Sequence, residues 1–148
     1  MNAEFITFVL APIGYAGLTI TAVLSARGRL PTALWRAVTI VIMTHVVLVW
    51  AVRYEWRLSE ATRNGYAGFV LFHGALLAII ASTVLREQLA RSLIIVAFGI
   101  VTLGAVPAVF RYEVVELYRI PVVLCALAGS AALLDGYRIS LRRRRVPS

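Results

Sequence analysis

Long, mostly apolar stretches without any charged residue alternate along this chain with short segments that always contain arginine. The uncharged stretches cover residues 5–26, 37–52, 64–85, 92–110 and 120–134. A bilayer core of about 30 Å is crossed by roughly 20 residues of apolar α-helix. Extended by the flanking residues that can reach the headgroups, the pattern predicts five transmembrane helices, over about 5–26, 33–54, 64–85, 91–110 and 117–137.

Composition supports a membrane solvent for most of the chain. Of 148 residues, 61% are hydrophobic, and the mean hydropathy is +0.86. A soluble domain of this size does not bury that much apolar surface. We therefore predict an all-α, polytopic integral membrane protein, with residues 1–148 as a single transmembrane domain and 138–148 as its basic cytoplasmic tail. The first span is expected to be retained, because Glu4 is the only charge before it and a signal peptide begins with positive charges.

The distribution of arginine predicts the orientation of the five helices. With the N-terminus outside, ten of the fifteen arginines lie on the cytoplasmic side and five outside. An excess of basic residues in short cytoplasmic loops is typical of multi-pass proteins, so we predict an N-out, C-in protein of the cell membrane. The excess of arginine on the cytoplasmic side then accounts for the net charge of +8. We expect the lipid bilayer and other membrane helices as partners, and no nucleic acid.

Small residues recur at spacings that suit helix packing in lipid. Gly17, Thr21 and Ser25 are four residues apart in the first span, as are Ala128 and Ala132 in the fifth. Small side chains let helix backbones approach closely, and this contact drives helix association in membranes. The sequence leaves open whether these faces pack inside the bundle or against another subunit.

Both histidines of the chain lie inside predicted spans. His45 precedes the outer end of the second span by about 12 Å, and His73 follows the outer end of the third by about 15 Å. Ionisable side chains at this depth are candidate functional residues, and imidazole is a common haem ligand. His45 and His73 are therefore candidate axial ligands of a haem b. Arg53, Arg57 and Arg63 are candidate partners of its propionates.

Other interpretations of these residues stay open. Each histidine can be structural and bond a neighbouring carbonyl or hydroxyl, or it can belong to a proton relay. The charged residues of the outer loops can form a charge-balanced cap of ion pairs rather than a binding site. Cys125 is the only cysteine, and no zinc-type Cys/His spacing occurs. We identify no catalytic residue, and whether the chain holds a metal ion stays open.

These residues favour a non-catalytic function, although they do not decide it. We predict an accessory or scaffold subunit of a membrane complex and do not expect an enzyme. The first alternative is a redox subunit that binds haem b through His45 and His73. The second is a small oligomeric transporter or channel. A functional site, if the chain has one, is expected between the second and third spans, in the outer half of the membrane.

Overall fold

The protein is a bundle of α-helices joined by short turns. The computed structural model describes the backbone of residues 3–63 and 65–144, and side chains as far as Arg138 except that of Val114. The long helices are α1 (Ala3–Ala26), α2 (Thr32–Leu48), α4 (Tyr66–Val84), α5 (Glu87–Arg111) and α6 (Arg119–Arg144). Three short helical segments join them: η1 (Val49–Arg53), α3 (Leu58–Ala61) and η2 (Glu113–Tyr118). No strand occurs in the part of the chain described.

The predicted helical class and number of long apolar helices are confirmed. Five helical segments are long and apolar enough to cross a membrane. They cover Ala3–Ala26, Thr32–Arg53, Tyr66–Val84, Glu87–Arg111 and Val115–Arg138. The second span continues from α2 through η1, a π-helical turn. Insertion into a membrane and its orientation stay predictions.

Several helix ends differ by a few residues from the predicted spans. The third span was expected from residue 64, which lies outside the described residues, and α4 begins at Tyr66. The helix α5 begins at Glu87 rather than 91, because Arg86 is extended and an acid in the first turn favours a helix N-terminus. Ahead of α6, Glu113–Tyr118 forms a 3-10 helix. The segment predicted as a tail continues α6 to Arg144, and residues 145–148 lie outside the described part.

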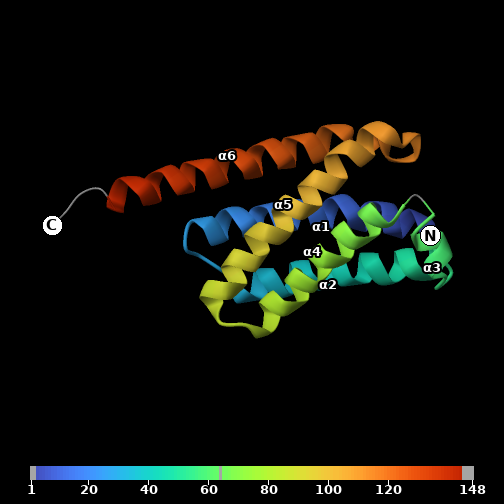
Figure 1. Cartoon of the computed structure of the whole chain (residues 1–148), viewed down its shortest axis with the longest axis horizontal. Helices are drawn as coiled ribbons and strands as arrows, with labels where there is room; N and C mark the ends of the chain where they lie inside the picture. The colour runs from blue at the N-terminus through green and yellow to red at the C-terminus, as the bar shows by residue number, and fades with distance from the viewer. Residues whose placement is uncertain (1–2, 64, 145–148) are drawn as a thin grey trace.

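The helices form two layers (Figure 1). In one layer, α1 lies between α2 and α6, with the three axes roughly parallel. The hairpin of α4 and α5 crosses this layer diagonally, and α5 packs on α1. The closest pairs are α1 with α2 and α4 with α5, as the short connections between them require. The side chains of Leu18, Ala22, Ile94 and Phe98 form the core where α5 crosses α1.

Glycines allow the closest helix approaches. A Cβ atom on Gly17 would lie 2.7 Å from Val38 Cγ2, and one on Gly129 would lie 2.3 Å from Phe98 Cζ. Thr21 and Ser25 of the predicted small-residue face are buried inside the bundle. That face of α1 therefore packs internally. Ala128, on the corresponding face of α6, is exposed and remains available to a partner.

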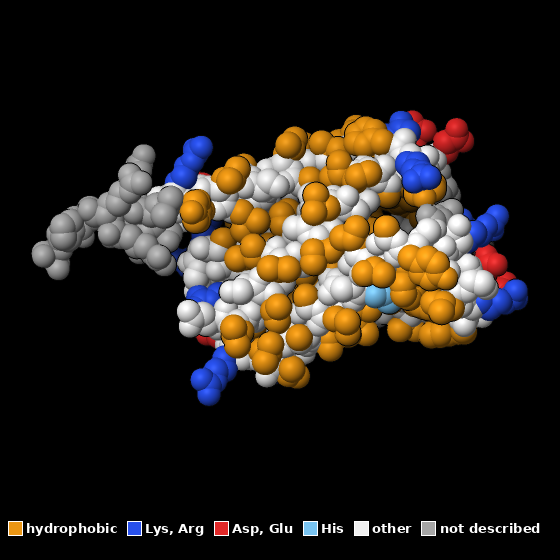
Figure 2. Space-filling model, in the orientation of Figure 1, with side chains coloured by type: hydrophobic (Ala, Val, Ile, Leu, Met, Phe, Trp, Pro, Cys, Tyr) orange, Lys and Arg blue, Asp and Glu red, His pale blue; other side chains and the backbone are white. Residues whose placement is uncertain are grey.

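Apolar side chains cover the sides of the bundle, and charges gather at its two ends (Figure 2). One end, which carries α3 and η2, is here called the α3 end and holds both arginines and glutamates. The opposite end carries the α1–α2 and α4–α5 turns and is here called the tail end. Gly136 of α6 lies there beside Ala26, the last residue of α1, so the remaining helix projects beyond the bundle (Figure 1). This distribution suits a bundle whose sides contact lipid.

Candidate functional site

His45 points from α2 toward α1. Its Nδ1 atom lies 3.0 Å from the backbone oxygen of Thr7. A carbonyl oxygen only accepts hydrogen bonds, so Nδ1 carries a proton and donates it. The imidazole is half-buried, and this bond ties the last turn of α2 to the first turns of α1.

His73 is held by two different neighbours. Its Nδ1–H donates to the Phe69 carbonyl oxygen one turn earlier, at 2.8 Å. Its Nε2 accepts a hydrogen bond from the Trp50 indole Nε1–H at 3.3 Å. The two bonds define a neutral imidazole with its proton on Nδ1. The Phe69 and His73 rings also stack, with centroids 4.0 Å apart.

Trp50 is the centre of an aromatic cluster at the α3 end. The cluster consists of Trp50, Tyr54, Trp56, Phe69 and His73, and every other ring lies between 5.7 and 6.3 Å from the Trp50 ring. It is the place where α2, through η1, meets α4. The sequence did not identify Trp50 as a partner of His73. The nearest signal was the four-residue spacing of Phe69 and His73, which places both rings on one helix face.

An unusual backbone reversal completes the cluster. Glu55 and Trp56 have positive φ values of 47° and 59°. Residues other than glycine rarely adopt this left-handed backbone conformation, which costs them about 1–3 kcal/mol. The reversal lets the Trp56 backbone N–H donate to the Trp50 oxygen at 3.0 Å and stacks the two indoles.

The three arginines predicted to meet propionates each have a carboxylate partner. Arg53 lies 3.3 Å from Glu4 of α1, and Arg63 lies 3.7 Å from Glu60. Arg57 pairs with Glu55. All three arginine side chains are more than half exposed. They form ion pairs at the surface, where such pairs add little stability.

The structure therefore brings the predicted site residues to one end of the bundle but gives them separate partners. His45 contacts α1, whereas His73 contacts Trp50. For both imidazoles to bind one iron, His73 Nε2 would first have to lose the Trp50 hydrogen bond. Haem ligation stays a prediction.

The described side chains contain no group of three or more His, Cys, Asp or Glu arranged to hold a metal ion. Cys125 is a half-buried free thiol on α6. Comparison of the chain with family models, with curated proteins and with solved structures gives no match. The function must therefore be inferred from the arrangement of the residues.

Proposed function

We propose that this protein is a non-catalytic accessory or scaffold subunit of a complex in the cell membrane. One observation carries the proposal: the polar side chains at membrane depth join one helix to another. His45 joins α2 to α1, and the pair of Trp50 and His73 joins η1 to α4. In lipid, such hydrogen bonds hold helices together, since the hydrophobic effect does not act between them.

A third bond of the same kind joins α1 to α5. The Thr102 hydroxyl donates to the Phe98 carbonyl oxygen at 2.7 Å, so the Tyr15 hydroxyl is the donor in its 2.8 Å bond to Thr102. The Tyr15 ring also stacks on Phe98, with an interplanar angle of 9°. These polar groups thus support a rigid bundle and are engaged in its packing.

The outward face of α6 supports an interaction with another membrane helix. Leu124, Leu127 and Leu134 are each at least 60% exposed. Ala128, also exposed, lies among them. Small residues between leucines allow a second helix to approach closely. We infer that a partner helix packs on this face.

Co-purification of the tagged full-length chain in a mild detergent tests the proposal. We expect a membrane protein to co-purify in constant ratio, and Ala128→Leu to lower that ratio because the larger side chain blocks close approach. Ala67→Leu, on the exposed side of α4, is the matched control and should retain the partner. A monodisperse lone monomer, or equal recovery with both variants, would contradict the proposal.

The absorption spectrum separates this function from the redox alternative. A scaffold without cofactor should show no Soret band after purification from haem-replete cells. A band that disappears in His45→Ala and in His73→Ala would instead support haem b ligation.

A further inference from the structure

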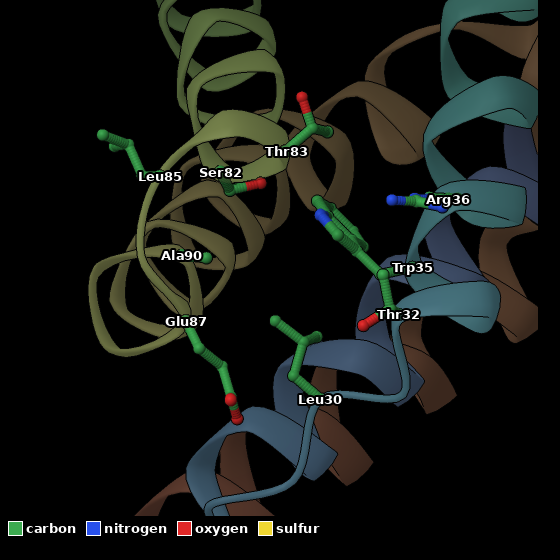
Figure 3. A pocket seen from close by; sticks show the side chains of 9 residues that line it. All are labelled: Leu30, Thr32, Trp35, Arg36, Ser82, Thr83, Leu85, Glu87 and Ala90. Atoms are coloured by element: carbon green, nitrogen blue, oxygen red, sulfur yellow. The ribbon is translucent and has the colours of Figure 1, made fainter.

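A small pocket opens at the tail end, between the first turn of α2 and the turn that joins α4 to α5 (Figure 3). Its volume is about 170 Å³. The buried part of its wall consists of Trp35, Ser82 and Ala90, and the rim includes the exposed residues Arg36 and Glu87. The pocket is remote from the aromatic cluster, which lies at the opposite end of the bundle.

Trp35 supplies an unused hydrogen-bond donor in this pocket. The residue is only 3% exposed, and its indole Nε1–H has no hydrogen-bond partner among the described residues. Figure 3 shows the indole ring projecting into the pocket, with its nitrogen edge turned toward α4. A buried N–H without an acceptor is costly, so a group that accepts from it is expected to bind favourably.

The other polar groups around the pocket favour an anionic ligand. Arg36 extends from α2 beside the indole, and no described carboxylate lies within ion-pair distance of it. The Glu87 carboxylate lies 3.9 Å from Arg91 on its own helix, which offsets its charge. Both α2 and α5 begin beside the pocket without a side-chain cap. Their first-turn N–H groups therefore add positive potential.

The position of the pocket indicates the source of the anion. It lies where the apolar helices give way to arginine-bearing turns, which is the level of lipid headgroups in a spanning bundle. Val84 and Leu85 beside it are 83% and 44% exposed, so apolar surface continues directly from the pocket. A ligand with a phosphate group and acyl chains matches both features.

We propose that this pocket binds the phosphodiester of a membrane phospholipid, with the Trp35 indole N–H and the Arg36 guanidinium donating to phosphate oxygens. The acyl chains follow the exposed apolar surface of α4. The proposal rests on the membrane placement proposed above but does not require a partner subunit, so the co-purification result leaves it unaffected.

Native mass spectrometry of the detergent-purified full chain, titrated with dioleoylphosphatidylglycerol, tests this site. The wild type should bind the lipid saturably. Trp35→Phe and Arg36→Gln should each weaken binding about tenfold, since each removes a hydrogen bond to a charged group. Arg63→Gln, which removes an exposed arginine at the opposite end, should leave binding unchanged.

Two further measurements keep the proposal falsifiable. Trp35→Phe also removes packed atoms from the core, so its unfolding temperature in lipid-free detergent is the baseline for that variant. The rise in unfolding temperature on adding lipid should be smaller for Trp35→Phe than for the wild type. Inorganic phosphate and glycerophosphoglycerol, the same headgroup without acyl chains, should bind far more weakly than the lipid. Equal binding by all variants, no saturable lipid binding, or equal affinity for the soluble phosphates would overturn the proposal.

Discussion

At the scale of single residues, the polar groups within the long helices have two kinds of partner. The Nδ1–H groups of His45 and His73 donate to backbone carbonyl oxygens. His73 Nε2 also accepts from the side chain of Trp50, and the Tyr15 hydroxyl bonds the side chain of Thr102. A carbonyl acceptor requires only that the ring reach a backbone. The Trp50–His73 bond instead requires two side chains from different helices to meet, so it reports directly on the packing of η1 against α4.

Trp50→Phe is expected to destabilise the bundle by about 1 kcal/mol, because it keeps an aromatic ring but leaves His73 Nε2 without its donor. The free energy of unfolding, measured by titrating detergent-solubilised protein with a denaturing detergent, checks this. Trp56→Phe is the control: that side chain is 65% exposed, and the change should cost less than about 0.5 kcal/mol. Equal losses for both variants would show that ring packing, and not the hydrogen bond, holds the cluster.

The sequence predicted where these residues lie better than what they contact. The placement of His45 and His73 within spans followed from counting residues along uncharged stretches, and the arginine–glutamate cap followed from the mixed charges of the loops. The contact of Trp50 with His73 could not be predicted, because it depends on how two helices are rotated about their axes. It also depends on the π-helical turn of η1, which shifts the direction of the side chains that follow it.

At the scale of helices, lengths and antiparallel pairs were predictable, whereas the central place of α1 was not. Uncharged stretches gave the lengths, and tight turns required α1 to pack on α2 and α4 on α5. To predict which helix lies at the centre, one needs a helix face whose residues differ from those on the faces of the other helices. In lipid, core and surface are equally apolar, so that difference is weak. The clearest sign in the structure is glycine, at the contacts of Gly17 with Val38 and Gly129 with Phe98.

Gly129→Ala should separate α6 from α5 and lower the free energy of unfolding by about 1–3 kcal/mol. The new methyl group would meet the ring of Phe98, a core side chain that is 1% exposed. Gly74→Ala is the matched control, because no atom outside its own helix lies within 4 Å of the added Cβ. It should be neutral or slightly stabilising, given the better helix propensity of alanine. Thermal unfolding of both variants in one detergent makes the comparison, and similar melting temperatures would contradict the close α5–α6 contact.

At the scale of the whole molecule, the two ends of the bundle differ in charge. In the described chain, the tail end carries arginines from both of its turns and few acids. At the α3 end, four arginines, Arg53, Arg57, Arg63 and Arg119, pair with glutamates. The sequence alone predicted this asymmetry, since each turn joins helices that run in opposite directions. Basic residues in short loops resist translocation, and acids contribute little. The same asymmetry therefore predicts that the tail end faces the cytoplasm.

Single cysteines at the two ends test this orientation. In a Cys125→Ala background, Ser59→Cys lies in α3 and Gln88→Cys in the first turn of α5, and both positions are exposed. A maleimide that does not cross membranes should label Ser59→Cys in intact cells, and label Gln88→Cys only after the cells are permeabilised. Replacing Arg86 and Arg91 with glutamine lowers the basic excess at the tail end and should yield a fraction with reversed labelling. Labelling of Gln88→Cys but not of Ser59→Cys in intact cells, without those replacements, would show that the bundle is inserted the other way. Labelling of both positions would show that α4, the long helix between them, does not cross the membrane.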